Sequence, residues 1–167
     1  MHNAHRVGNY WKYIPECGDR AICQMCGEED NLEHILIKCR SPGPEIIWKA
    51  AEKLWQGKGP NWPEISIGSI LGCGLMRFED ERGKEKPGTR RLYRILVSKS
   101  AYTIWKLRPV GRNRPRLDPA LVYNTWAGTL DDEGSLPVNW LKEPRVLVGR
   151  RALTESQIQY RSSVGIG

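Results

Sequence analysis

Apolar residues recur at helical spacing in two stretches of the chain. In residues 45–56 they fall at i, i+4, i+7 and i+8, with charged side chains between them. These positions are Ile47, Ala51, Leu54 and Trp55. A longer stripe in steps of three and four lies in residues 89–108 and comprises Tyr93, Leu96, Val97, Ser100, Ala101, Ile104 and Leu107. The pattern predicts two amphipathic helices, the second capped by Thr89 and ended by Pro109.

The rest of the chain gives less regular patterns. Residues 1–22 alternate aromatic and polar side chains around "NYWKYIP", which predicts an extended lead-in. The "SPGP" stretch at residues 41–44 predicts a break in the chain. Residues 64–75 are apolar and punctuated by glycine, which is consistent with a short strand or a packed loop. Residues 120–149 fit either short strands or one helix and one strand, because their periodicity does not decide between them.

Composition indicates a small chain with many loops. Hydrophobic residues make up 40% of the 167 positions, and there are 17 Gly and 11 Pro, so we expect a lean core and irregular connections. No apolar run reaches the length of a membrane helix, and the first residues lack the apolar run of a signal peptide. We therefore expect a small, mainly α fold in an intracellular protein, nuclear or cytoplasmic, with no membrane partner.

Positive charge is concentrated in one segment. Residues 82–116 hold twelve Lys and Arg against one acidic residue, a net charge of +11, whereas the whole chain carries +7. Such a block is typical of contact with nucleic acid, and a tyrosine among cations can stack on a base. The candidate nucleic-acid-binding residues are Arg90, Arg91, Arg94, Lys99, Tyr102, Lys106, Arg108, Arg112, Arg114 and Arg116. The alternative is an ordinary solvated helix face and a polar linker.

Three cysteines and one histidine cluster early in a chain that has five cysteines and three histidines. Cys23, Cys26, His34 and Cys39 have the spacing C-x2-C-x7-H-x4-C. Zn²⁺ takes thiolate and imidazole ligands in a tetrahedron, and a Cys-x2-Cys turn directs two sulfurs at one ion. Thiols stay reduced inside cells, so metal binding is favoured over disulfides. The sequence therefore predicts a Zn²⁺ site with these four ligands.

The residues around this cluster favour a small zinc finger. Gly27 follows the second cysteine, where such a turn often needs a positive φ. Asn31 is expected to cap a short helix that carries His34. The apolar back of this helix is expected to comprise Leu32, Ile35 and Leu36. Four protein ligands leave no position for water or substrate, which indicates a structural ion. Such an ion supplies roughly 10–16 kcal/mol of apparent binding free energy, enough to fold a segment this small.

Breaks in composition divide the chain into three parts. Residues 1–40 hold the lead-in and the CCHC zinc finger, and residues 41–116 form a helical region that includes the basic segment. Residues 117–167 form a C-terminal tail segment. The near-neutral finger is expected to contribute shape and base stacking through Trp11 or Tyr13, while the basic segment supplies the salt-dependent affinity.

Several stretches resemble a known family. The stretches "RAICQMCGEEDNLEHILIKC", "GNYWKYIP", "IWKAAEKLW" and "RLYRILVSKSAYTIWKLR" are similar to the zinc-binding region at the C-terminal end of fungal non-LTR (LINE-type) retrotransposon polyproteins. "TWAGTLDDEGSLP" and "RVLVG" extend the resemblance to about Arg150. In that family the region follows the reverse transcriptase and ribonuclease H domains. The connection "PVGRNRPRLDP" is shorter than the corresponding segment of the family usually is.

The resemblance implies a ligand set and a role. Cys23, Cys26, His34 and Cys39 stand at the positions of the family's CCHC ligands. The implied role is a zinc-stabilised nucleic-acid-binding module that helps the polyprotein to hold template RNA or target DNA. The implied partners are RNA or DNA and the remainder of the polyprotein. Two alternatives stay open: a zinc-stapled protein-interaction module that docks through exposed tryptophans, and a transposon remnant without function.

The sequence offers no catalytic motif. Polymerase and ribonuclease H chemistry needs several carboxylates converging on Mg²⁺. The acidic pair Asp131 and Asp132 in "TLDDEG" has no partner motif and fits a solvated turn better. Neither a Ser-His-Asp arrangement nor a glycine-rich phosphate loop can be identified. The chain is therefore not expected to be an enzyme by itself. The two cysteines outside the predicted metal site, Cys17 and Cys73, are expected to be free thiols.

Overall fold

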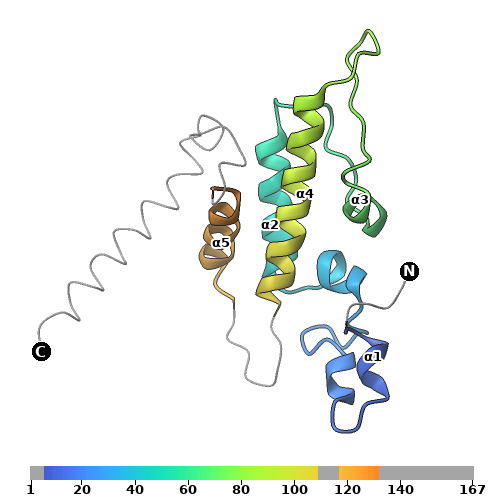
Figure 1. Ribbon diagram of the computed structural model, residues 1–167. Coiled ribbons are helices and arrows are strands. Elements are labelled where there is room, and N and C mark those ends of the chain that lie inside the picture. The colour runs from blue at the N-terminus through green and yellow to red at the C-terminus, as the bar shows by residue number, and fades with distance from the viewer. Residues whose placement is uncertain (1–5, 109–116, 132–167) are drawn as a thin grey trace, which may run out of the picture.

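The computed structural model describes residues 6–108 and 117–131, and this part of the chain is mainly helical (Figure 1). Its helices are α1 (Asn9–Lys12), α2 (Pro42–Trp55), α3 (Ile67–Leu71), α4 (Pro87–Leu107) and α5 (Pro119–Asp131). A 3₁₀ turn, η1 (Gly18–Ala21), and a π-helical turn, η2 (His34–Lys38), precede α2. The described residues form no strand, only two isolated β-bridges. The prediction of a small, mainly α fold is confirmed.

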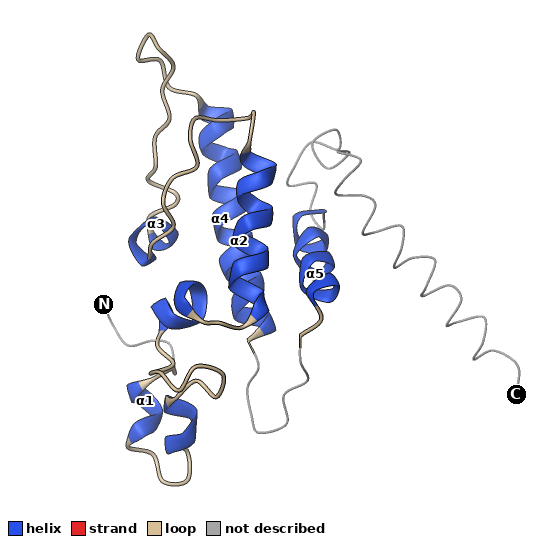
Figure 2. Cartoon of the chain, turned by 180° about the vertical axis from the view of Figure 1, so that it is seen from behind, coloured by secondary structure: helices blue, strands red, loops and turns tan. Residues whose placement is uncertain are grey.

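Two antiparallel helices, α2 and α4, form the centre of the molecule (Figure 1). Helix α5 packs against both of them, and α3 packs against α4. Figures 1 and 2 show α3 and α5 on opposite sides of the central pair. The turn η2 contacts α2 and α4 where α2 begins and α4 ends. The segment with the four predicted metal ligands is therefore attached to one end of the helical core.

The core between α2, α4 and α5 is largely apolar, and polar pairs at Ser100 and Thr103 join α4 to α5 within it. Val122, Trp126 and Leu130 lie four residues apart on α5 and are each at most 1% exposed. The indole N–H of Trp126 donates a 2.8 Å hydrogen bond to Oγ of Ser100, which is fully buried on α4. This bond satisfies a donor that burial would otherwise make costly, and it fixes α5 against α4.

An aromatic cluster closes the end of the core that lies away from η2, where α2 ends and α4 begins. Trp55, Phe78 and Tyr93 are buried with ring centroids 5.3–5.7 Å apart, and Trp62 packs on two of them. The indole N–H of Trp55 donates to the Pro60 carbonyl at 2.6 Å. Burial raises the pKa of the Tyr93 hydroxyl. Edge-to-face aromatic pairs add attraction beyond the burial of apolar area, so this cluster fixes α2, α4 and the loop between them.

Both predicted helices start earlier than the sequence pattern indicated. The "SPGP" stretch does not break the chain but forms the first turn of α2, because a proline at N1 needs no backbone N–H. In the same way α4 begins at Pro87, so Thr89 lies inside the helix and is not its cap. In both cases proline was interpreted as a breaker where it begins a helix.

One predicted segment is wrong, and for two others the structure shows which element forms where the sequence left the choice open. The predicted extended lead-in is wrong for its described part, which forms α1 and η1. The apolar stretch 64–75 contains the short helix α3, capped by Ser66, whose side chain accepts from the Ser69 N–H at 3.1 Å. Within the predicted tail, residues 119–131 form the single helix α5, and residues 132–167 lie outside the described residues.

The hydrophobic core crosses the predicted segment boundaries. Ile35 and Leu36 of η2 are 3–4% exposed and belong to the same buried cluster as the apolar faces of α2, α4 and α5. Leu32, the third residue of the expected apolar back, packs against that cluster from a partly buried position. The described parts of residues 1–40, 41–116 and 117–167 are thus joined by shared packing.

We expect Ser100→Ala to destabilise the protein, because it leaves the buried indole N–H of Trp126 without an acceptor. The free energy of unfolding should fall by about 1–3 kcal/mol in urea denaturation. Ser98→Ala, at an exposed site on the same helix, is the matched control and should leave the free energy of unfolding nearly unchanged. Equal effects of the two substitutions would contradict this role for the hydrogen bond.

Candidate metal centre

A tight turn presents the first two cysteines. The Gly27 N–H donates to the Cys23 carbonyl at 2.8 Å, and the Cys23 N–H donates to the Glu28 carbonyl at the same distance. Gly27 has a φ of 71°, as the sequence predicted for this position. An isolated bridge between Ile22 and Glu29 closes the base of the turn. Cys23 and Cys26 are therefore held on the same short loop.

The turn η2 presents the other two ligand side chains. Oδ1 of Asn31 accepts a 2.9 Å hydrogen bond from the His34 N–H, which confirms the predicted cap. The Cys39 N–H donates to the His34 carbonyl at 2.7 Å, five residues back. This bond belongs to a π turn, which has more residues per turn than an α-helix and is frequent at functional sites. It brings the residue five positions after His34 back toward the imidazole.

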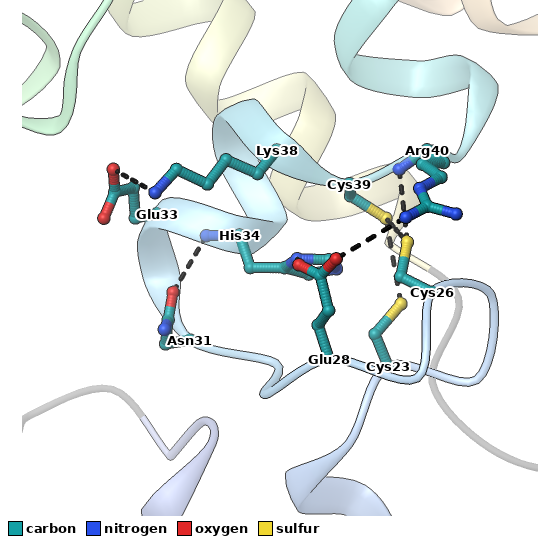
Figure 3. Close-up of polar contacts among 9 residues, drawn as sticks. All are labelled: Cys23, Cys26, Glu28, Asn31, Glu33, His34, Lys38, Cys39 and Arg40. Atoms are coloured by element: carbon teal, nitrogen blue, oxygen red, sulfur yellow. Dashed lines mark hydrogen bonds and ion pairs between the residues drawn. The ribbon is translucent and has the colours of Figure 1, made fainter.

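The four predicted ligands converge (Figure 3). Sγ of Cys39 lies 3.8 Å from Sγ of Cys23 and 3.9 Å from Sγ of Cys26. One ligand atom from each of the three cysteines and from His34 lies within 4.8 Å of all the others. Such a Cys₃His group has the donor chemistry of a metal site, and it could bind a metal ion.

The ring nitrogens of the buried His34 lack hydrogen bonds. His34 is 2% exposed, and neither Nδ1 nor Nε2 makes a hydrogen bond within the described structure, although Oε2 of Glu28 lies 3.3 Å from Nδ1. A buried imidazole without hydrogen bonds is costly, because both polar atoms lose their contacts with water. A metal ion at the centre of the cluster would satisfy one nitrogen by coordination. The residues present therefore fit a bound cation.

Two residues outside the candidate ligand set contact the cluster, Glu28 through its side chain and Arg40 through its backbone (Figure 3). Oε2 of Glu28 lies 3.3 Å from Nδ1 of His34, close enough to orient the ring, and this favours Nε2 as the ligand atom. The backbone N–H of Arg40 donates to Sγ of Cys26 at 3.3 Å, and its guanidinium lies 3.7 Å from Oε1 of Glu28. An N–H donated to sulfur favours the thiolate that a metal requires.

The remaining cysteines lie outside this cluster. Cys17 and Cys73 are free thiols in the structure, and neither belongs to the converging group. Burial raises the pKa of the Cys73 thiol, which keeps it protonated and a poor ligand. Four protein ligands complete a tetrahedron, so the arrangement fits an ion that stabilises the fold and not one that binds a substrate.

A buried ion pair joins this site to α4. Arg108, which follows α4 directly, pairs with Asp30, and their side chains are only 14% and 6% exposed. The Arg108 guanidinium also lies over the Trp105 ring, 5.6 Å from its centroid. From the sequence, Arg108 is a candidate for binding nucleic acid, and no role is predicted for Asp30. No local pattern distinguishes Asp30 from the two exposed glutamates before it, so only the fold identifies this pair.

The other candidate nucleic-acid residues occupy different environments. Arg91, Arg94, Tyr102 and Lys106 are exposed on α4, and Lys99 is half-buried there. The remaining described candidate, Arg90, is tied to Glu85 by a 2.6 Å ion pair. Arg112, Arg114 and Arg116 lie outside the described residues. The structure therefore gathers four of the ten candidates as exposed side chains of one helix.

Comparison with protein-family models, curated proteins and solved structures found no match to this chain. None of the helices within residues 6–108 and 117–131 is long and apolar enough to cross a membrane. The case for a function therefore depends on the geometry and chemistry of the residues themselves.

Removing one ligand should release the metal and destabilise the end of the core to which η2 is attached. We expect purified wild-type protein to contain one metal ion per chain and Cys26→Ser to contain far less, with a lower thermal unfolding midpoint. Elemental analysis and circular dichroism measure the two effects. Cys17→Ser is the matched control and should keep the full metal content; a metal-free wild-type protein would contradict the assignment.

Arg108→Ala should destabilise the protein strongly, because it leaves the buried carboxylate of Asp30 without its counter-ion. We expect a loss of about 3 kcal/mol in the free energy of unfolding, measured by chemical denaturation. Lys49→Ala, which breaks an exposed ion pair with Glu45 on α2, provides the comparison and should have little effect. Similar losses for both substitutions would show that burial of the pair is irrelevant.

Proposed function

We propose that this chain is a zinc-stabilised nucleic-acid-binding module. Its proposed partners are template RNA or target DNA, in the setting of a retrotransposon polyprotein that the sequence resembles. The observation that carries the proposal is the attachment of a Cys₃His cluster to the end of a long helix whose exposed side chains are basic and aromatic. We do not assign catalysis to the chain itself.

Zn²⁺ is the ion that suits the cluster best. Thiolates bound to Zn²⁺ at about 2.3 Å in a tetrahedron have sulfur atoms about 3.8 Å apart. The two sulfur separations from Cys39, 3.8 and 3.9 Å, agree with that edge length. Soft thiolate ligands with one imidazole also favour Zn²⁺ over the oxygen-preferring Mg²⁺ and Ca²⁺. The proposed role of the ion is to hold η2 and the cysteine turn on the helical core.

The exposed face of α4 is suited to a polyanion. Arg91, Arg94, Ser98, Tyr102 and Lys106 follow one another in steps of three and four, so they form a single stripe about 22 Å long. Helix α4 contains no acidic residue. Among the described residues, no carboxylate forms an ion pair with the two arginines or with the lysine of this stripe. These cations are available for phosphates.

The stripe is better suited to phosphates than to base sequence. Arginine and lysine on an exposed helix face neutralise phosphates and release counter-ions, which gives affinity that falls with salt. The Lys106 ammonium lies 5.7 Å from the centroid of the Tyr102 ring, and that ring is 54% exposed. An exposed ring among cations can also stack on an unpaired base. The proposed binding is therefore largely independent of sequence.

The burial of the tryptophans disfavours the alternative of a protein-interaction module. It required exposed tryptophans, and none of the six tryptophans in the described part of the chain is exposed. Two of them, Trp55 and Trp126, are buried in the core. Exposed leucines do occur, at Leu71 and Leu75 in and after the short helix α3 and at Leu121 on α5, but none of them belongs to the basic stripe.

Reversing two charges of the stripe should weaken binding and reduce its salt dependence. We expect Arg91→Glu together with Arg94→Glu to lower affinity for single-stranded DNA or RNA at low salt by at least about tenfold. The slope of log affinity against log salt should fall by about one to two, because each phosphate contact contributes about 0.7. Fluorescence anisotropy over a salt series measures both quantities.

The matched control changes the same net charge elsewhere. Lys49→Glu together with Lys53→Glu lies on the exposed, mixed-charge face of α2 and should leave the salt slope unchanged. Equal losses in the two double variants would mean that only total charge matters, not the stripe. A wild-type protein that binds no nucleic acid at low salt would exclude the proposed function.

A further inference from the structure

The segment of residues 6–22, which contains α1 and η1 and is called the N-terminal lobe below, carries a second group of aromatic and cationic side chains, away from α4. In α1 and the loop after it, Tyr10, Trp11 and Tyr13 lie close together in sequence. Each has a cation near its ring: Arg6 lies 5.8 Å from the Tyr10 centroid, Arg20 lies 5.1 Å from that of Trp11, and Lys12 lies 5.8 Å from that of Tyr13. The three cations of the α4 stripe, Arg91, Arg94 and Lys106, are not part of this group.

Two of the three rings, those of Tyr10 and Trp11, are held by local structure. The indole N–H of Trp11 donates a 2.6 Å hydrogen bond to the Arg6 carbonyl, and Tyr10 packs edge-to-face on Trp11 at 5.0 Å. The turn η1 packs against α1 and carries Arg20 over the indole. The Tyr13 ring is 81% exposed, so a flat ligand can reach it without any movement of the core.

We propose that this lobe is a stacking site for the unpaired bases of a single-stranded nucleic acid, an inference that rests on the proposed function. Unpaired bases stack on aromatic rings and on guanidinium planes, and neighbouring cations attract the phosphates between them. Tyr13 offers the open ring, and the exposed Arg20 offers a guanidinium group that lies over the Trp11 ring, 5.1 Å from its centroid. A duplex hides its base faces, so this site selects single strands.

The two surfaces have different chemistry, so their contributions to binding should depend differently on salt and on the presence of bases. The stripe on α4 meets mainly phosphates, so most of its binding persists on a strand without bases. Any stacking on Tyr102 is unchanged by substitutions at Tyr13 or Arg20, so those variants report on the N-terminal site alone. The N-terminal lobe requires the bases themselves, and its contribution depends less on salt because stacking is not a charge interaction. An oligonucleotide of abasic sites retains the phosphates and lacks the bases, so it separates the two contributions.

The test compares the full zinc-loaded chain on three probes: a single-stranded oligonucleotide, an abasic oligonucleotide of the same length and the matching duplex. We expect the base-containing single strand to bind about tenfold more tightly than the abasic strand. Tyr13→Ala and Arg20→Lys should each reduce this preference severalfold and leave abasic binding unchanged, since Lys keeps the charge and loses the plane. Tyr13→Phe should keep the preference.

The control and the outcomes distinguish this inference from the proposed function. Leu75→Ala removes an equally exposed apolar side chain, 85% exposed, and should change no affinity. Equal binding of the abasic and base-containing strands, or a preference untouched by Tyr13→Ala, would overturn the stacking site while the phosphate-binding stripe stands. Absence of binding to all three probes would overturn both.

Discussion

The convergence of three thiols and one imidazole is the constraint on which the rest of the arrangement depends. The large apolar side chains next to Cys23 and Cys26, Ile22 and Met25, are exposed, so they do little to fix this loop on the helices. A shared cation would hold it through four bonds instead. The same turn that supplies His34 also sends Ile35 and Leu36 into the core. Ligand geometry and core packing therefore act on one short segment and reinforce each other.

The end of α4 is fixed from two directions. The turn η2 packs on it, and Asp30, next to the cysteine loop, binds Arg108 where the helix ends. Buried ion pairs contribute more to a defined geometry than to net stability, because desolvation offsets most of their attraction. In this protein the pair joins the end of α4 to the segment that carries the candidate metal ligands. The candidate site and the proposed binding face are thus connected through the same helix.

Sequence reasoning found the parts of the molecule whose chemistry is local. The ligand spacing, the positive φ of Gly27 and the cap at Asn31 all follow from short-range rules, and the structure confirms them. The apolar stripes gave α2 and α4 for the same reason. The predicted starts of these two helices were wrong, because proline can either begin or end a helix and the local sequence does not decide between the two. In this protein Pro42 and Pro87 begin helices. The partnership of Asp30 with Arg108 spans 78 positions, and only the packed helices bring it together.

The π turn at His34–Lys38 limits how this stretch of sequence can change. Its closing bond joins residues five apart, and both ends of that bond belong to candidate metal ligands. The turn leaves four residues between the imidazole and the last thiol, and two of them, Ile35 and Leu36, are buried in the core. A smaller or polar side chain at either position would disturb the packing of the helices and the approach of His34 and Cys39 together. This stretch is therefore constrained by what lies between its two candidate ligands as well as by the ligands themselves.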